Sequence, residues 1–294
     1  MFQFTKILVP LDGSELAERA LAPALVVAQA TSATIVLLRV IPPLFLSVDP
    51  LVYDQISQQG EDEALAYLRN LQTQPILAET AVHLVTLSGP VATTILQYAQ
   101  EHACDLIVMS THGRSGVSRW VYGSIAEKVL HDACCHVLII RAQIDSDIFA
   151  HKRLLVPLDG SKLSEKALPP ALCLAHALPA ELVVLSVTPP THFSIETPTM
   201  KQQSDYLEDH EVEDTQVYMQ AIRASLSDQP LAFEVEIIKG PVAETIIDYA
   251  DSHRIDLIIM SSHGRSGISR WIYGSVTEKV LRGASVATLV IRGQ

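Results

Sequence analysis

The sequence is short of positive charge, of cysteine and of long hydrophobic runs, and each shortage excludes a class of protein. Its 21 lysines and arginines stand against 33 acidic residues, for a formal net charge of -12. Nucleic-acid phosphates repel such a chain at long range, so we expect no general nucleic-acid binding. The apolar residues form short segments such as KILVPL, ATIVLLRV and DLIVMS, and none reaches the ~18 residues of a transmembrane helix. The sequence therefore predicts no membrane span.

Cysteine occurs 4 times, and its pattern excludes both a disulfide framework and a zinc finger. Cys134 and Cys135 are adjacent in HDACCH, a spacing unlike that of zinc ligands. So few cysteines indicate a reducing compartment. The first residues, MFQFTKILVPLDGS, show no basic region, apolar signal core or cleavage site, so we expect a cytoplasmic protein.

The chain is a tandem repeat. Three segments of the first half, LVPLDGS, GPVA and GRSGVSRWVYGS, return in the second half as LVPLDGS, GPVA and GRSGISRWIYGS. The longest of them differs between residues 113–124 and 264–275 by two Val/Ile exchanges. The polar, aperiodic segment 142–151 is the predicted linker. Length and repetition together predict two domains of roughly 150 residues each.

Within each repeat, uninterrupted apolar runs alternate with helical patterns. Such runs are typical of strands buried on both faces of a sheet. We predict strands at residues 6–9, 34–40, 82–87, 106–110 and 137–140, and at 154–156, 182–187, 233–238, 257–261 and 288–291. In the first repeat, helical patterns cover residues 14–30, 61–72, 90–100 and 124–130. The alternation predicts an α/β fold with a mostly parallel sheet and right-handed crossovers.

Ligand-binding residue types follow the first and fourth predicted strands. A parallel sheet of this kind binds ligands outside the carboxyl ends of its strands, where the strand order reverses. Asp12 and Asp159 follow the first strands, and glycine loops follow the fourth strands. An acidic side chain there can accept hydrogen bonds from a ribose, and a glycine loop that leads into a helix can hold phosphates. The alternative is structural, because Asp-Gly before a helix is also a turn and N-cap signal.

The repeated loop combines backbone freedom with positive charge. Gly113 and Gly116 allow positive φ, so successive N–H groups can converge on an anion. Two arginines stand in each copy of the loop, although the chain is acidic overall: Arg114 and Arg119, and Arg265 and Arg270. His112 and His263 either donate to a phosphate or cap the turn.

The end of the loop has a second interpretation. Ser124 with Glu127, and Ser275 with Glu278, match a capping box that begins the last helix of each repeat. The two interpretations are compatible, because a capped helix N-terminus still stabilises a phosphate through the helix dipole.

The arrangement resembles the universal stress protein family in its tandem form, over nearly the whole chain. Nucleotide-binding members carry a signature of Gly, two residues, Gly, nine residues, then Gly followed by Ser or Thr. The later part of this signature is present twice, as Gly113, Gly123 and Ser124 and as Gly264, Gly274 and Ser275. Ser110 and Ser261 replace its leading glycine. Their Cβ atoms could crowd a bound nucleoside, or their hydroxyls could instead bond ribose or phosphate. The resemblance implies domains at residues 1–142 and 151–294.

The resemblance also implies a fold and a ligand. Each half would be a Rossmann-like domain of the adenine nucleotide alpha hydrolase type, with a five-stranded parallel sheet in the order 3-2-1-4-5 and helices on both faces. Each would bind ATP or another adenine nucleotide, with or without Mg²⁺. The last strands of two such domains commonly pair, which implies an intrachain pseudo-dimer and allows a homodimer.

Family membership further implies the contacts. Val40 and Val187 would meet the adenine through backbone groups, and Asp12 and Asp159 would bind the ribose. The other implied binding residues are Pro10, Met109, Ser110, His112, Gly113, Arg114, Ser115, Gly123, Ser124 and Ile125, and Pro157, Met260, Ser261, His263, Gly264, Arg265, Ser266, Gly274, Ser275 and Val276.

Two other functions stay open on the sequence. A nucleotide-free interaction module would keep the fold for dimerisation, and changes near Ile139 would then matter more than changes to the loop arginines. A hydrolase would need a Walker lysine, a nucleophile elbow or paired carboxylates at the loop, and the sequence shows none of them. We therefore expect no catalytic or metal-binding residues, and ATP hydrolysis that is slow at most. The acidic segment 205–214 is predicted to be a solvated helix face.

Overall fold

The computed structural model describes residues 2–43, 50–78, 80–111, 123–141, 149–190, 198–262 and 274–292. The chain divides into two compact units. Unit 1 comprises Met1–Ile148 with Ala287–Arg292, and unit 2 comprises Phe149–Val286 with Gly293–Gln294. Among the described residues, no helix is long and apolar enough to cross a membrane.

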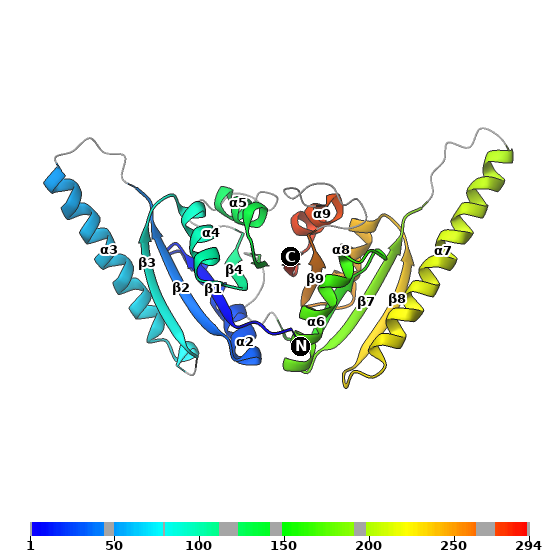
Figure 1. The fold of residues 1–294 in the computed structure, drawn as a ribbon, viewed down its shortest axis with the longest axis horizontal. Coiled ribbons are helices and arrows are strands. Elements are labelled where there is room, and N and C mark those ends of the chain that lie inside the picture. Colours follow the sequence, from blue (N-terminus) through cyan, green and yellow to red (C-terminus); the bar gives the residue numbers. More distant parts are fainter. Residues whose placement is uncertain are drawn as a thin grey trace. The chain divides into compact units, whose positions relative to one another are not determined.

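Unit 1 is built on a parallel sheet with the strand order β3-β2-β1-β4-β5 (Figure 1). Its strands are β1 (Lys6–Leu11), β2 (Thr34–Ile41), β3 (Val82–Ser88), β4 (Leu106–Ser110) and β5 (His136–Ile140). Leu8 pairs with Val36 on one side and with Ile107 on the other. The order therefore reverses between β1 and β4, where the sequence places the candidate ligand.

The helices of unit 1 are α1 (Glu15–Glu18), α2 (Leu21–Thr31), α3 (Pro50–Gln72), α4 (Val91–Glu101) and α5 (Ser124–Asp132), with a 3-10 turn η1 (Pro75–Leu77). The single helix predicted over 14–30 is in fact two. Pro23 has no N–H to donate, so it is tolerated in the first turn of α2 but not inside one long helix. Helix α3 begins earlier than predicted and includes Gly60 in its interior.

Unit 2 repeats this plan with the strand order β8-β7-β6-β9, and Figure 1 labels β7, β8 and β9 of this sheet. Its strands are β6 (Arg153–Pro157), β7 (Glu181–Thr188), β8 (Phe233–Lys239) and β9 (Leu257–Ser261). Its helices are η2 (Ser164–Ala167), α6 (Leu168–Ala177), α7 (Pro198–Leu226), α8 (Val242–Ser252) and α9 (Ser275–Gly283). The register is also repeated, because Leu155 pairs with Val183 and with Ile258.

The last strand, β10 (Ala287–Ile291), is grouped with unit 1 and pairs antiparallel with β5. Leu289 lies opposite Leu138, and Thr288 lies opposite Ile139. The backbone N–H of Arg292 donates to His136 Nδ1 at 3.1 Å. The last strands of the two repeats are thus paired in the manner that the family resemblance implies.

Burial differs between the inner and outer strands. Every residue of β4 and β9 is buried, as predicted. No residue of β3 or β8 is fully buried, so the prediction of burial on both faces is wrong for these two strands. An outer strand has one neighbour instead of two, which leaves its backbone and part of its side chains near solvent.

Two other segments can be compared with their predictions. Phe149, within the predicted polar linker, is buried with 7% exposure, so this end of the linker packs against the protein. Residues 142–148 lie outside the described part. The acidic segment 205–214 lies within α7, and its described acidic side chains, Glu213 and Asp214, are exposed, as expected for a solvated face.

An aspartate ties the first strand of each unit to the fourth. Asp105, just before β4, accepts hydrogen bonds from the Thr5 and Lys6 backbone N–H groups at 2.7 and 3.2 Å. Asp256, just before β9, accepts from His151 and Arg153 at 3.2 and 3.0 Å. The same clamp therefore holds the neighbouring strands on which both candidate sites are built.

Candidate functional site

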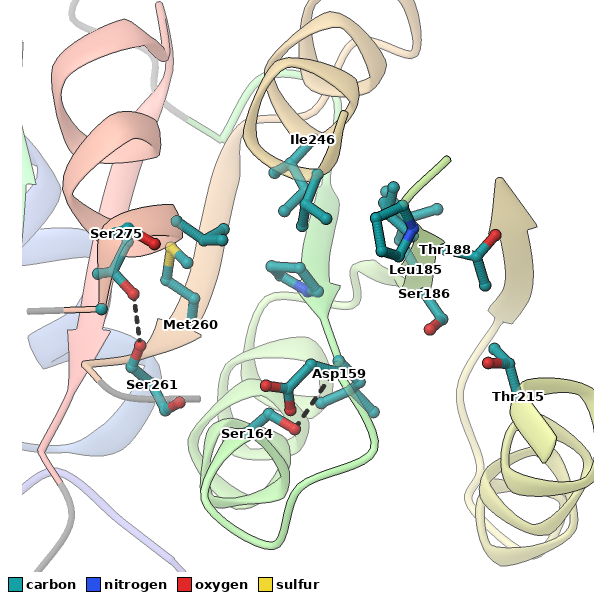
Figure 2. A pocket seen from close by; sticks show the side chains of 18 residues that line it. Asp159, Ser164, Leu185, Ser186, Thr188, Thr215, Ile246, Met260, Ser261 and Ser275 are labelled. Carbon is teal, nitrogen blue, oxygen red and sulfur yellow. Dashed lines mark hydrogen bonds between the residues drawn. The ribbon is translucent and has the colours of Figure 1, made fainter. Parts of the chain in front are cut away.

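A cavity of about 290 Å³ lies at the carboxyl ends of β6, β7 and β9 in unit 2. Small-molecule sites span ~300–1,000 Å³, so this cavity is near the lower end of that range. Apolar side chains from Leu185, Ile246 and Met260 form part of its wall. Figure 2 shows Ser186, Thr188 and Thr215 on one side and Ser261 and Ser275 on the other. The cavity thus combines an apolar wall with converging hydroxyl groups.

Every described residue of the site predicted for the second repeat lines this cavity. These residues come from β6 and the turn after it, from β7, from β9 and from the start of α9, and they are Pro157, Asp159, Val187, Met260, Ser261, Gly274, Ser275 and Val276. The remaining predicted residues, His263, Gly264, Arg265 and Ser266, lie outside the described residues.

Asp159 is held in position by the turn that follows β6. Its Oδ1 accepts the Ser161 backbone N–H at 3.0 Å, and Ser161 Oγ accepts the Ser164 N–H at 3.1 Å. Gly160 has φ +82°, a conformation that side chains other than glycine rarely adopt. The carboxylate is therefore fixed at the rim of the cavity before any ligand arrives.

The turn after β1 in unit 1 is built in the same way. Asp12 Oδ1 accepts from the Ser14 N–H at 2.9 Å and from Ser14 Oγ at 2.5 Å. Ser14 is the N-cap of α1, and its side chain accepts from Ala17 N. The structural interpretation of the Asp-Gly-Ser segment is confirmed, and it leaves the aspartate at the carboxyl end of the strand.

The capping box predicted at the last helix of each repeat is wrong. Helix α9 begins at Ser275 and its N-cap is Gly274, with no side-chain hydrogen bond at the cap. Helix α5 has the same start, with Gly123 as N-cap and Ser124 as the first helical residue. A glycine N-cap has no side chain to bond the first turn. Helix starts without such a cap present N–H groups that an anion can accept.

Two hydrogen bonds hold α9 against the fourth strand. The Gly274 N–H donates to Ser262 O at 3.0 Å, and Thr277 Oγ1 donates to Ser261 O at 3.1 Å. In unit 1 the Gly123 N–H donates to Thr111 O at 3.0 Å. The helix N-terminus is thereby set beside Ser261, the residue that replaces the leading glycine of the family signature.

Tyr218 on α7 places a protonated hydroxyl near the aspartate. Burial raises the pKa of Tyr218, and the neighbouring carboxylates of Glu165 and Asp159 raise it further. A phenol whose pKa is raised stays neutral at physiological pH, so Tyr218 adds no negative charge to this region.

The described residues of the site predicted for the first repeat occupy the equivalent positions of unit 1. They end β1, β2 and β4 or begin α5, and they are Pro10, Asp12, Val40, Met109, Ser110, Gly123, Ser124 and Ile125. Ile125 is 39% exposed, and Met109 and Ser110 are buried. His112, Gly113, Arg114 and Ser115 lie outside the described residues.

Comparison with known proteins identifies the family of this chain and supports its fold. The model of the universal stress protein family matches residues 3–141 and again residues 150–292. This chain belongs to the universal stress protein family. A universal stress protein of Thermus aquaticus is 34% identical over 146 residues, which cover 47% of this chain and 99% of that protein. The predicted family and the tandem α/β fold are confirmed.

One solved structure shares the fold of both repeats. The crystal structure of a universal stress protein from Archaeoglobus fulgidus DSM 4304 superposes with a TM-score of 0.70 at 23% identity, over 99% of each chain. A universal stress protein solved in complex with cAMP covers 47% of this chain and 98% of its own, at 21% identity and a TM-score of 0.39.

Several cavity residues of this universal stress protein were missed from the sequence. They share a hydroxyl group and are Ser164, Ser186, Thr188, Thr215 and Thr277. They lie outside the family signature, and Thr215 comes from the long helix α7. An alignment of the two repeats could have identified them as positions where the repeats differ. None of these five residues has a hydroxyl residue as its counterpart in the first repeat.

Proposed function

We propose that this universal stress protein binds ATP or a related adenine nucleotide in the cavity of unit 2, and that occupancy of the cavity serves as a stress-response signal. One observation carries the proposal. Eight residues selected from the sequence as nucleotide contacts, from four separate segments, line a single cavity at the carboxyl ends of a parallel sheet. Ligands of this class of sheet bind at that place.

The chemistry of the cavity suits the three parts of a nucleotide. The apolar wall at Leu185 and Ile246 suits an adenine, with Val187 also lining the cavity. Asp159 suits the ribose, because a carboxylate accepts hydrogen bonds from two neighbouring hydroxyls. The start of α9 at Gly274 and Ser275 suits a phosphate, because it presents N–H groups and the positive end of the helix dipole.

The same residues favour binding over catalysis. Among the described residues that line the cavity, Asp159 is the single ionisable side chain. General acid–base catalysis needs a group that takes a proton and a group that gives one, in positions near the reacting atoms. We therefore expect any ATP hydrolysis to be far slower than the ~10 per second of a median enzyme.

Isothermal titration of the full chain with ATP and Mg²⁺ tests the proposal. Asp159→Asn keeps an acceptor for the Ser161 N–H and removes the charge, so we expect the fold to persist and ATP affinity to fall by about 10- to 100-fold, the equivalent of one charged hydrogen bond. The matched control is Asp251→Asn. Asp251 accepts from Ser285 Oγ on the surface of unit 2 and does not line the cavity. Equal losses in the two variants would contradict the assignment of Asp159.

A failed titration would favour the second candidate function. If the parent protein gives no binding heat with ATP, ADP, AMP or cAMP, the nucleotide proposal is wrong. The antiparallel pairing of β5 with β10 supports a nucleotide-free interaction module in that case, because none of its paired residues lines the cavity of unit 2. A homodimer and a cytoplasmic location stay predictions, and native mass spectrometry of the purified protein would measure subunit number and retained nucleotide together.

A further inference from the structure

The two repeats differ at the positions that line the cavity. Ser261 and Ser275 have serine counterparts in unit 1, but at five other lining positions unit 2 carries a hydroxyl group and unit 1 does not. The pairs, in chain order, are Ser164 and Ala17, Ser186 and Arg39, Thr188 and Ile41, Thr215 and Ala64, and Thr277 and Ala126. Four of these changes replace a hydroxyl residue by an apolar one. The remaining change introduces a guanidinium group.

Arg39 and Ser186 occupy the same place in the two sheets. Arg39 in β2 is the partner of Leu11, at the carboxyl end of β1. Ser186 in β7 follows Leu185, which is the partner of Pro157 at the carboxyl end of β6. The side chain of Ser186 lines the cavity of unit 2, on the same side as Thr215 (Figure 2). Arg39, at the position of Ser186, therefore extends toward the part of unit 1 that corresponds to the cavity of unit 2.

The guanidinium of Arg39 lies over the turn that holds Asp12. Its Nη1 donates to Leu11 O at 3.2 Å. A Cβ atom built on Gly13 would lie 3.7 Å from Arg39 Nη2. The positive charge thus stands beside the aspartate that the family resemblance assigns to the ribose. A guanidinium in this place occupies space next to the aspartate and competes with hydroxyl donors for it.

A half-buried tyrosine, Tyr67, lies near the same arginine. Tyr67 Oη donates to Glu18 at 2.8 Å. Burial raises the pKa of Tyr67 most, the hydrogen bond with Glu18 raises it further, and the charge of Arg39 opposes them. Asp12 acts on the same hydroxyl. Arg39 therefore stands at the end of β1, in a region where the charges of Glu18 and Asp12 also act.

We propose that Arg39 excludes the nucleoside from unit 1, so that this universal stress protein has one adenine nucleotide site, the cavity of unit 2, and one closed counterpart. The inference rests on the proposed function and departs from the expectation of a site in each half. Ser186 is then the residue that admits the ligand, because its small side chain leaves the space that Arg39 fills.

The stoichiometry of ATP binding, measured by isothermal titration of the full chain, tests the inference. We expect one ATP per chain for the parent protein, two for Arg39→Ser, and none for Ser186→Arg at concentrations that saturate the parent. Arg69→Ser is the matched control for the first variant, because Arg69 is exposed on α3. Ser227→Arg is the control for the second, because Ser227 is exposed between the end of α7 and the start of β8, away from the carboxyl ends of the strands. Both controls should bind one ATP.

The outcomes separate this inference from the function on which it rests. Two ATP per chain in the parent would overturn the closure of unit 1 and keep nucleotide binding. No ATP in the parent and in Arg39→Ser would overturn both. One ATP in the parent that survives in Ser186→Arg would place the site elsewhere and overturn the inference. If Arg39→Ser does not fold, as judged by its thermal melt, Arg39→Ala replaces it, with two ATP expected and one ATP overturning the role of Arg39; the parent and Ser186→Arg test the number of sites and their location without altering unit 1.

Discussion

Unit 1 and unit 2 share a frame, by which we mean the strand register and the aspartate clamp. They differ in the side chains at the carboxyl ends of the strands. Leu8 and Leu155 occupy the same register, and Asp105 and Asp256 make the same clamp. The carboxyl ends of the strands carry Arg39 in one unit and Ser186 in the other. Frame residues satisfy buried backbone groups, so most exchanges there cost stability. The exchange of Ser186 for Arg39 changes the space and the charge at the cavity position, so this difference concerns the ligand more than the fold.

The largest expected effect is a loss of stability when a clamp aspartate is removed. Asp256 is 8% exposed, whereas Asp105 is half-buried and its hydrogen bond to Thr5 is exposed. Removing an acceptor from a buried N–H costs about 1–3 kcal/mol per orphaned donor, and less where water replaces it. We expect Asp256→Ala to lower the free energy of unfolding by about 3 kcal/mol and Asp105→Ala by about 1 kcal/mol, in denaturant titrations.

This prediction has a clear contrary result. A larger loss for Asp105→Ala than for Asp256→Ala would show that burial does not set the cost of the clamp. The conservative variants Asp105→Asn and Asp256→Asn keep one acceptor each and should lose less than the alanine variants.

A second, somewhat smaller effect would sharpen the contrast between the two loops. Arg114 and Arg265 lie outside the described residues, and their sequence position assigns them to a phosphate. We expect Arg265→Ala to weaken ATP by about 10- to 100-fold, since a charged hydrogen bond is worth ~1.5–3 kcal/mol, and to change adenosine by less than twofold. Arg114→Ala should have the smaller effect on ATP if unit 1 is closed. Titration with both ligands measures this, and equal losses for ATP and adenosine would contradict the phosphate assignment.

The smallest expected effect is a pH dependence of stability that arises from a histidine in β5. The corresponding position of β10 has no ionisable side chain. His136 begins β5, and Ala287 stands at the corresponding position of β10. Burial lowers the pKa of His136, which packs against Phe2 and Phe4. The unfolded chain takes up this proton near pH 6.5, whereas the folded chain does so only at lower pH. Stability should therefore fall as the pH drops below about 6.5, by at most ~1.4 kcal/mol per pH unit.

The variant His136→Asn isolates this contribution. Asparagine keeps an acceptor for the Arg292 N–H and does not titrate, so thermal melts between pH 5 and 7.5 should show a shallower loss of stability than in the parent. His83→Asn is the matched control, because His83 is exposed on β3. A slope unchanged in His136→Asn would show that the protonation of this histidine does not oppose folding.

The sequence predicted the strands well and the helices less well, for physical reasons. Apolar runs such as residues 106–110 are typical of strands buried on both faces of a parallel sheet, and their alternation with helical patterns favoured that fold. The 14–30 segment looked continuous because its apolar spacing is helical, but Pro23 divides it. The predicted capping boxes placed Ser124 and Ser275 at the N-caps. In the structure Gly123 and Gly274 are the N-caps, because each helix starts one residue earlier than the motif predicts.

For the candidate site, repetition and the family signature identified residues on four segments, including Asp159 and Ser275. They did not identify Thr215 or Ser186. Thr215 reaches the cavity from a helix whose own pattern indicates only an amphipathic surface. Ser186 differs from its counterpart Arg39, and a strand pattern alone does not show which of the two admits a ligand.

By itself, the sequence determined that this protein has two α/β repeats of one family, each with an aspartate and a glycine loop after neighbouring strands. Those features depend on periodicity, turn chemistry and residue spacing, which are local. The tertiary structure decided which side chains share a cavity and which arginine lies over the Asp12 turn. These contacts depend on how strands and helices that are distant in the chain pack together, and a local sequence pattern does not predict them.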